Sequence, residues 1–424
     1  MNSPPIFNIL MYSHDTYGLG HIRRSMAIAN HLRGLNTNVL ILTGSPIAGR
    51  FSFPGQVDFV RMPGMIKKTN DDYQSLSIRI DQDQALNIRT NIILATAQAF
   101  RPDLFIVDKE PHGLKREVLP TLEWLKNNCP QSKSILGLRD ILDDAEVVCR
   151  DWLEKGVYQS LVDLYDEIWI YGEREIYDPV AEYRFPAEIH NRVFFTGYIP
   201  RAKAACQKRK KIRGQYSVME GDLFILVTPG GGGDGAEMVD HFVDMHHYLP
   251  ASLPVKSLIV TGPFMPRKRR ETVQKKAKIF GIKSIPFHPR MEDLMDAADL
   301  VVSMGGYNTV CEILSHRVPA LIIPRETPRR EQLIRAKCLN RLNLIDYICW
   351  HEANPLLLKD KFLSLLAHRQ TYSQNMAAFK LSGLEGIARR ISSCKNAVWE
   401  NEGLFGNAGG QESPQARPMS LITV

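Results

Sequence analysis

Short apolar runs recur along the whole chain, and stretches with helical spacing lie between them. Several runs are apolar at every position, as expected of strands buried on both faces of a parallel sheet. The intervening stretches, such as HIRRSMAIANHLRGL from residue 21, carry apolar residues at helical spacing. This alternation predicts doubly wound α/β structure. The predicted strands are 7–12, 38–43, 104–108, 134–138, 167–172 and 192–197, then 222–228, 256–262, 283–287, 299–305 and 319–324.

The two sets of runs predict two domains, 1–200 and 214–371, and a chain of 424 residues is long enough for both. Between them, RAKAACQKRKKIR (201–213) carries seven basic residues and no acidic one, which predicts a solvated linker. Alternatively, this basic segment could border a site for a phosphate-rich ligand or contact an anionic membrane. Residues 372–400 predict one terminal helix. Residues 401–424, rich in Gly, Pro, Ser and Gln, predict a disordered tail.

Composition narrows the class of protein. The hydrophobic content of 44% and charged content of 23% are ordinary for a globular protein. Seven scattered cysteines without a C-x-x-C pair argue against a disulfide framework or a zinc ribbon. The sequence has no run of about 18 apolar residues and no signal-peptide pattern at its start. We therefore expect a cytoplasmic protein, and the mild net charge of +7 permits an anionic ligand or membrane surface.

Three glycine-rich loops follow predicted strands and lead into predicted helices. They are SHDTYGLGH (13–21), TPGGGGDGAEM (228–238) and SMGGYNTVCEI (303–313). In open α/β sheets, ligands bind beyond the carboxyl ends of the strands. Exposed backbone N–H groups and a helix dipole at such a corner suit a phosphate group.

Two common phosphate motifs do not fit these loops. The loop 228–238 has no lysine after its glycines, so it is not a P-loop. The first loop has Arg23 where a dinucleotide fingerprint needs its third glycine, and no acidic residue lies between Asp15 and Asp58. A sugar-nucleotide site shared between two α/β domains is the remaining interpretation.

The motifs together resemble a known family. GLGHIRRS (18–25), the glycine loop 230–235 and the segment 303–336 are similar to GT-B glycosyltransferases of the MurG-like family 28 type, and more narrowly to a group of bacterial predicted glycosyltransferases. The resemblance covers roughly residues 5–395 and implies two facing Rossmann-like domains with a cleft between them. It also implies a donor held mainly by the second domain and a terminal helix that crosses back to the first.

The resemblance implies roles for residues of the second domain. Glu312 would accept hydrogen bonds from the ribose hydroxyls, which suits a carboxylate facing a vicinal diol. Arg290 and Met291 lie where the family holds the base, and Glu331 and Gln332 where it holds the transferred sugar. The diphosphate would be held by Gly230, Gly231, Gly232, Gly233, Gly305, Gly306, Asn308 and Thr309. Asp234 is unfavourable beside a diphosphate and is expected to cap the following helix instead.

The catalytic candidate is His21, beside Gly18 and Gly20 of the acceptor-side loop. Inverting transfer needs a base that takes the proton of the acceptor hydroxyl, and histidine titrates in the right range. A helix N-terminus also disfavours the imidazolium form. His14, Asp15 and Glu110 are alternatives, because each follows a strand that should face the same cleft.

The sequence and the resemblance together predict an inverting glycosyltransferase that uses a nucleoside diphosphate sugar, with UDP as the expected nucleotide. No metal or other cofactor is expected, because helix N-termini would neutralise the diphosphate, and Asp81-Gln82-Asp83 lies away from the donor motifs. The expected acceptor is lipid-linked or a saccharide, with a peripheral contact at the inner face of the membrane left open, and no nucleic acid. The alternatives are a nucleotide-sugar hydrolase or epimerase of the same fold, or a non-catalytic nucleotide-sugar-binding protein.

Overall fold

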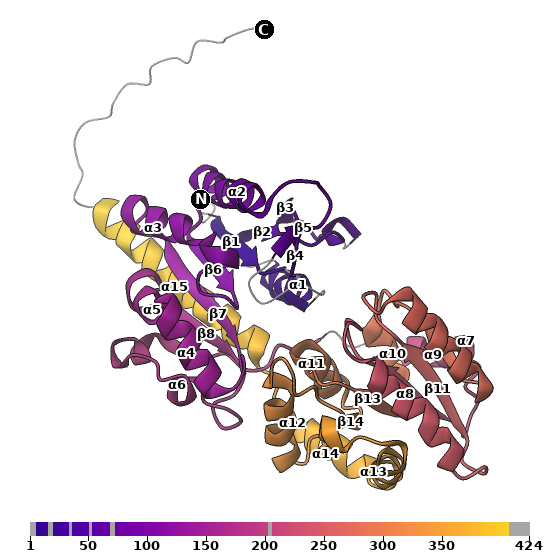
Figure 1. Cartoon of the computed structure of the whole chain (residues 1–424). Coiled ribbons are helices and arrows are strands. Elements are labelled where there is room, and N and C mark those ends of the chain that lie inside the picture. The colour runs from indigo at the N-terminus through magenta and orange to yellow at the C-terminus, as the bar shows by residue number, and fades with distance from the viewer. Residues whose placement is uncertain are drawn as a thin grey trace.

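The computed structural model contains two parallel β-sheets, one from each half of the chain. In Figure 1 the indigo-to-magenta half and the magenta-to-orange half form two lobes, called here the first and second units. The predicted fold class of two doubly wound α/β units is confirmed. The structure describes residues 6–15, 20–33, 36–50, 53–67, 73–201 and 206–406.

Seven parallel strands make up the sheet of the first unit. They are β1 (Phe7–Ser13), β2 (Thr37–Thr43), β3 (Val57–Arg61), β6 (Leu104–Asp108), β7 (Lys133–Arg139), β8 (Glu167–Tyr171) and β9 (Val193–Phe195). Their order is β3-β2-β1-β6-β7-β8-β9, so the winding reverses between β1 and β6. Such a reversal is where open α/β sheets bind ligands. Two short antiparallel strands, β4 (Met65–Lys67) and β5 (Tyr73–Ser75), form a separate pair.

The sheet of the second unit has six parallel strands. They are β10 (Leu223–Thr228), β11 (Val255–Val260), β12 (Lys283–Ile285), β13 (Leu300–Ser303), β14 (Ala320–Ile322) and β15 (Asp346–Tyr347). Their order is β12-β11-β10-β13-β14-β15, so the winding reverses between β10 and β13. Two of the predicted glycine loops follow these two strands.

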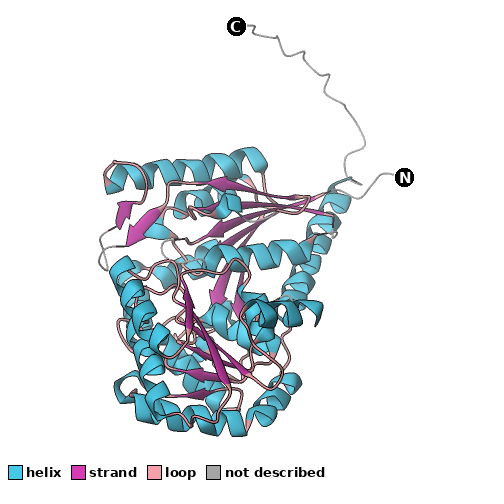
Figure 2. Cartoon of the chain, turned by 90° about the vertical axis from the view of Figure 1, so that its right-hand side faces the viewer, coloured by secondary structure: helices cyan, strands magenta, loops and turns pink. Residues whose placement is uncertain are grey.

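Helices cover both faces of each sheet, as Figure 2 shows. The α-helices are α1 (Gly20–Leu32), α2 (Gln82–Phe100), α3 (Leu119–Asn128), α4 (Ala145–Lys155), α5 (Val157–Leu164), α6 (Pro179–Glu182), α7 (Cys206–Gln215), α8 (Ala236–Met245), α9 (Arg267–Ile279), α10 (Met291–Ala297), α11 (Tyr307–His316), α12 (Glu331–Arg341), α13 (Pro355–Ala367), α14 (Arg369–Ala378) and α15 (Gly383–Gly406). Short 3-10 helices span Ala48–Arg50, Leu114–Arg116, Ala187–Arg192, His246–Tyr248 and Trp350–Glu352.

Strand residues alternate between two apolar cores, which explains why the strands are apolar at nearly every position. In β1, Leu10 and Tyr12 belong to one core, whereas Ile9 and Met11 belong to the core on the opposite face. All four are almost fully buried. Both faces of the sheet therefore need apolar side chains, as in other parallel sheets.

The start of α11 packs against the first unit. Tyr307, the first residue of α11, is buried in the core of the first unit. Its hydroxyl donates to the backbone oxygen of Tyr171 at 2.9 Å, and its ring stacks on Tyr198 with centroids 5.9 Å apart. The start of α11 is thereby fixed against the first sheet.

The basic segment 201–213 is not a solvated linker along its length, because its residues from Cys206 onward belong to α7. Arg209 and Arg213 donate to the two oxygens of Asp299 at 3.0 and 2.8 Å. Ile212, on the same helix, is buried in the second unit's core. These ion pairs and the buried Ile212 hold this charged helix on the second unit.

The predicted single helix over 372–400 is divided into α14 and α15. Gly383, at the start of α15, donates from its N–H to the oxygen of Tyr198 at 3.0 Å. A Cβ at Gly383 would lie 2.6 Å from that oxygen, so only glycine permits this approach. Ile387 and Ile391 then enter the core of the first unit, and the yellow helix lies along that lobe in Figure 1. Residues 407–424 of the predicted tail lie outside the described residues.

Candidate active site between the two units

The loop after β1 and the loop after β13 meet where the units join. Gly20, the first residue of α1, lies against Asn308 in the first turn of α11. A Cβ at Gly20 would come 2.5 Å from Asn308 Nδ2, so the close approach of the two helix starts depends on glycine. Gly18, the other glycine of the predicted acceptor-side loop, lies outside the described residues.

His21 is held by a carboxylate that follows the neighbouring strand. Its Nδ1 lies 2.5 Å from Oδ2 of Asp108, the last residue of β6. Arg24, one turn along α1, donates from Nε and Nη2 to the same carboxylate at 2.9 and 2.6 Å. Burial alone would raise the pKa of Asp108, but Arg24 and His21 outweigh it and hold this pKa well below its usual range.

An ionised Asp108 only accepts hydrogen bonds, so Nδ1 of His21 must carry a proton. The 3.0 Å approach of Arg24 Nη2 to the same Nδ1 is then a contact between two donors and not a hydrogen bond. The remaining ring nitrogen, Nε2, is left as an acceptor. Burial lowers the pKa of His21 to about 4, although Asp108 acts in the opposite direction. The ring is therefore neutral at pH 7 and able to take a proton.

Two of the alternative bases lie in the same region. The ring of His14 is 5.7 Å from that of His21, and its Nδ1 lies 3.2 Å from the hydroxyl of Tyr12. Burial lowers the pKa of His14 well below its usual value, and Lys109 adds to this effect. Glu110 forms an ion pair with Lys109 at 2.8 Å. Burial opposes its ionisation, but Lys109 and His14 hold its pKa well below the usual range.

Asp15 has bonds that tie it to the start of α1. Its Oδ1 accepts from the N–H of Ile22 at 3.1 Å, and its Oδ2 accepts from the hydroxyl of Thr43 at 2.5 Å. Burial raises its pKa to about 6. Both carboxylate oxygens thus support the loop that places His21.

The glycine loop after β10 lies beside the start of α11. Gly230 and Gly232 have φ of 79° and 89°, which glycine adopts without strain. A Cβ at Gly232 would lie 2.1 Å from the oxygen of Thr261, and one at Gly230 would lie 3.9 Å from Oγ1 of Thr309. The structure therefore brings the two predicted phosphate loops together.

The loop after β13 makes a tight turn into α11. Gly305 has a φ of 75°, and a Cβ there would lie 2.6 Å from Ile322. Gly306 caps the helix without a side-chain hydrogen bond, and a Cβ added to it would meet open space. This helix start therefore offers uncapped N–H groups and a positive dipole end.

Glu312 points toward the first unit. It is 3% exposed, and its Oε1 accepts from Nη1 of Arg23 at 3.0 Å. The other end of the Arg23 guanidinium donates to Glu292 at 2.9 Å. Burial raises the pKa of Glu312, and the charge of Arg23 opposes that rise. Nearby, Arg201 donates to Oδ1 of Asn308 at 2.6 Å.

Arg325 connects the predicted sugar-binding residues with the loop after β10. Its Nη2 donates to Glu331 at 2.7 Å, and its backbone N–H donates to Oε1 of Gln332 at 3.1 Å. Its Nη1 donates to Asp234 at 2.8 Å. Asp234 therefore does not cap α8 as expected, because Gly235 occupies the cap position and Arg325 is hydrogen-bonded to the Asp234 carboxylate.

Other predicted residues have local partners. The Arg290 side chain is 63% exposed and pairs with Asp293 of its own helix at 2.8 Å. Met291, at the start of α10, packs against the core of the second unit. Asp81 caps α2 by accepting from the N–H of Gln84 at 2.7 Å. Contact of Arg290 and Met291 with a nucleotide base stays a prediction.

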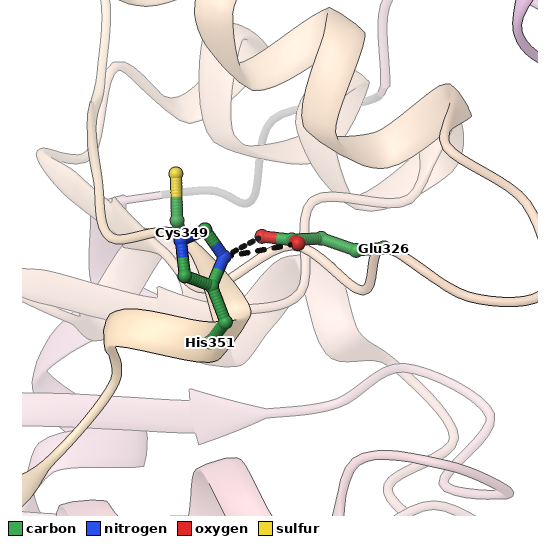
Figure 3. Close-up of side chains that lie close together, drawn as sticks. All are labelled: Glu326, Cys349 and His351. Atoms are coloured by element: carbon green, nitrogen blue, oxygen red, sulfur yellow. Dashed lines mark hydrogen bonds and ion pairs between the residues drawn. The ribbon is translucent and has the colours of Figure 1, made fainter.

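Within the described residues, one group has the side chains and spacing to hold a metal ion, namely Glu326, Cys349 and His351 (Figure 3). Their ligand atoms lie within 4.8 Å of one another. His351 Nδ1 is 3.2 and 3.1 Å from the two oxygens of Glu326. Thiolate, imidazole and carboxylate together are ligands that suit zinc. The group lies on the second unit; Glu326 falls within the matched segment 303–336, whereas Cys349 and His351 lie beyond it, and the sequence predicted no role for any of the three.

Four functional candidates escaped sequence reasoning, namely Asp108, Arg23, Arg24 and Arg201. Asp108 had a usable signal, because it ends a predicted strand next to Glu110. The three arginines had none, since their partners lie elsewhere in the sequence: Arg23, for example, is 289 residues from Glu312.

Comparisons with known proteins show similarity to glycosyltransferases. Residues 224–391 match the model of the glycosyltransferase family 28 C-terminal domain. UDP-N-acetylglucosamine--N-acetylmuramyl-(pentapeptide) pyrophosphoryl-undecaprenol N-acetylglucosamine transferase of Oenococcus oeni is 24% identical over 224 residues, which cover 50% of this chain and 57% of that protein. The same-named protein of Clostridium kluyveri is 32% identical over 90 residues, 21% of this chain and 26% of that protein. The matched part of the chain thus spans between about a quarter and somewhat over half of the length of these curated relatives.

Solved structures resemble nearly the whole chain. Acinetobacter baumannii MurG aligns with a TM-score of 0.60 and 14% identity over 92% of this chain and 100% of that one. A UDP-glucosyltransferase from Polygonum tinctorium aligns with a TM-score of 0.61 and 13% identity over 94% and 100%. At these identities the likeness establishes the fold alone. The chain therefore has the GT-B glycosyltransferase fold, and residues 224–391, which hold most of its second unit, are similar to the glycosyltransferase family 28 C-terminal domain.

Proposed function

We propose that the protein is an inverting, metal-independent glycosyltransferase that moves a sugar from a nucleoside diphosphate to a hydroxyl acceptor. The observation that carries the proposal is the 2.5 Å bond between His21 and Asp108 at the place where α1 meets α11. It sets a neutral, oriented imidazole beside the helix start that suits a diphosphate. Because the curated relatives are named for UDP-N-acetylglucosamine, UDP is the nucleotide to test first.

In the proposed mechanism, Nε2 of His21 takes the proton of the acceptor hydroxyl as its oxygen attacks the anomeric carbon. The bond to the diphosphate breaks on the opposite face of the sugar, which inverts the configuration. The ionised Asp108 stabilises the imidazolium that forms, as the carboxylate of a catalytic triad does. The negative charge left on the diphosphate is stabilised by the N–H groups around Gly230 and Gly306.

Glu312 is proposed to accept hydrogen bonds from the ribose hydroxyls. In the structure its Oε1 accepts from Arg23 at 3.0 Å. Donor binding therefore requires Arg23 to give up or share this carboxylate. That requirement couples the donor site of the second unit to α1, the helix that carries His21.

The acceptor is proposed to be a lipid-linked or saccharide hydroxyl, since the curated relatives are named for an undecaprenol-linked acceptor. None of the helices in the described part of the chain has the length and apolarity to cross a membrane. Independently of that finding, we propose that a lipid-linked acceptor is reached by peripheral contact at the inner face of the membrane.

The test is to incubate the purified protein with several nucleotide sugars, with and without lipid or saccharide acceptors, and to measure nucleotide release. Release that depends on an acceptor supports transfer. Release of free sugar without any acceptor would favour a hydrolase, and binding without turnover would favour a non-catalytic protein.

A further inference from the structure

A group of basic side chains lies at the junction of the units and has no part in the mechanism above. Lys109 follows the end of β6, and Arg139 is the last residue of the adjacent strand β7. The N–H of Lys109 donates to the oxygen of Gly137 at 2.7 Å, so the two strand ends lie side by side. Arg329 belongs to the second unit, in the segment that leads into α12. We call Lys109, Arg139 and Arg329 the basic cluster.

The three charges lie close enough to affect one another. Burial lowers the pKa of Lys109 to about 8; Glu110 opposes this, and the positive charges of Arg329 and Arg139 lower it further. The segment bearing Arg329 is held against the first unit, because the next residue, Arg330, donates its N–H to Asp143 at 2.8 Å. Glu110, which pairs with Lys109, is also affected by the positive charge of Arg329.

Arg139 lacks a partner for a buried donor. Its Nε is buried, and no described residue accepts a hydrogen bond from it. Burial lowers its pKa to about 10. The nearby Glu331 is engaged with Arg325 through Oε1, while its Oε2 is itself buried and unbonded. A buried donor without an acceptor is costly, which indicates that an acceptor atom of a ligand completes this site.

Lys109 also has an unusual backbone. Its φ of 71° lies in the left-handed region, where a residue with a Cβ is strained. The conformation turns the chain just after Asp108 and leaves the Lys109 side chain only 10% exposed. A strained, enclosed lysine next to the catalytic candidate is typical of a residue that serves a ligand.

We propose that Lys109, Arg139 and Arg329 bind a carboxylate or phosphate group carried by the transferred sugar or by the acceptor. The planar guanidinium forks match both groups, and the ammonium adds a point charge. The donor's own diphosphate is expected elsewhere, at Gly230 and Gly306. The identity of the ligand rests on the proposed function, whereas the anion site itself does not.

The experiment measures binding of inorganic phosphate by calorimetry in the presence of saturating UDP, which fills the diphosphate site. Wild-type protein should bind phosphate, and Arg139→Gln should weaken this binding by roughly 10- to 100-fold, as for a lost hydrogen bond to a charged group. Arg150→Gln is the matched control, because Arg150 is an exposed arginine on α4. No phosphate binding to wild type, or equal binding to folded Arg139→Gln, would overturn the proposal.

Lys109→Gln provides a second variant if Arg139→Gln does not fold, with the same expected loss. A comparison of UDP-glucose with UDP-glucuronate then identifies the source of the anion. A preference for the glucuronate that disappears in Arg139→Gln places the anion on the sugar. Equal binding of the two donors, with phosphate still bound beside UDP-glucose, places it on the acceptor.

The outcomes separate this proposal from the proposed function. If UDP does not bind at all, the donor assignment fails, yet phosphate binding without UDP still tests the basic cluster through the same variants. If Arg139→Gln weakens UDP itself, the guanidinium belongs to the donor diphosphate, and the anion site proposed here is wrong.

Discussion

Arg335 of α12 and Asp140, just beyond β7, form a doubly hydrogen-bonded ion pair that joins the two units. Nε and Nη2 of Arg335 donate to the two carboxylate oxygens at 2.8 and 2.7 Å. The two side chains are 0% and 1% exposed. Tyr198 donates to the same carboxylate at 2.8 Å. The pair lies in the junction that also holds Tyr307, so it fixes how the second unit faces His21.

Removing one partner of this pair should strongly destabilise the protein. Arg335→Ala leaves Asp140 buried without its counter-charge, so we expect a loss of about 3–5 kcal/mol in the free energy of unfolding. Arg330→Ala is the control, because Arg330 and Asp144 form an exposed pair at 3.4 Å. Exposed pairs contribute at most about 1 kcal/mol. Urea denaturation measures both, and equal losses would show that the Arg335 pair is not stabilising.

The donor assignment predicts a specific loss for Glu312→Ala. Nucleotide-sugar affinity should fall by about 1.5–3 kcal/mol, the range for hydrogen bonds to a charged group, with the fold intact. Glu292→Ala is a matched control, since it removes the other carboxylate bound by Arg23. Calorimetry with UDP-sugars measures both variants. Unaltered affinity in Glu312→Ala would remove this residue from the donor site.

Metal independence can be tested by chelation. Activity should survive excess EDTA, because the N–H groups at the start of α11 and in the loop after β10 are proposed to neutralise the diphosphate. Loss of activity that Mg²⁺ or Mn²⁺ restores would contradict this and redirect attention to Asp81 and Asp83. Loss that only Zn²⁺ restores, and that Cys349→Ser reproduces, would implicate the group in Figure 3.

The dependence of rate on pH tests the environment of His21. A base must be neutral, so the rate should rise as pH passes upward through the pKa of His21. An unperturbed histidine would place that rise near neutrality, whereas burial lowers this pKa to about 4. We therefore expect kcat to be flat across neutral pH and to fall only in acid. A rise centred near pH 7 would show that His21 is more solvated, or that another group is the base.

Most of the fold could be predicted because buried parallel strands are continuously apolar. All eleven predicted strands are present, and 104–108 matches β6 at both ends. The strands β3 and β15 were missed. Asp58 and Arg61 interrupt the apolar pattern of β3, and β15 has only two residues. The break before α15 was missed because it depends on the approach of Gly383 to Tyr198, a contact between distant segments.

The site was predictable only where its signal is local. Glycines after strands indicated the proposed donor loops, because the backbone geometry of such loops requires glycines within a few consecutive residues. Pairs such as Arg23 with Glu312, or Arg201 with Asn308, join segments more than 100 residues apart. Nothing in a single sequence connects such residues, and their roles follow from the packing of one unit on the other.

In the proposed mechanism, His21 is the base that takes the acceptor proton, and Asp108 orients it. We expect Asp108→Asn, like a substitution of His21 itself, to lower kcat, because an amide cannot stabilise the imidazolium as a carboxylate does. Donor affinity should be nearly unchanged in both Asp108→Asn and His21→Ala, since the proposed donor contacts lie on the second unit. Glu110→Gln and His14→Ala test the alternative bases in the same cleft.

The most direct test is kcat for nucleotide release at saturating donor and acceptor, compared between His21→Ala and Glu110→Gln. We expect His21→Ala to lose roughly 10²–10⁴-fold in kcat, the usual contribution of a positioned base, and Glu110→Gln to retain most of its rate. Near-normal kcat in folded His21→Ala, together with loss of activity in Glu110→Gln, would contradict the account and place the base after β6.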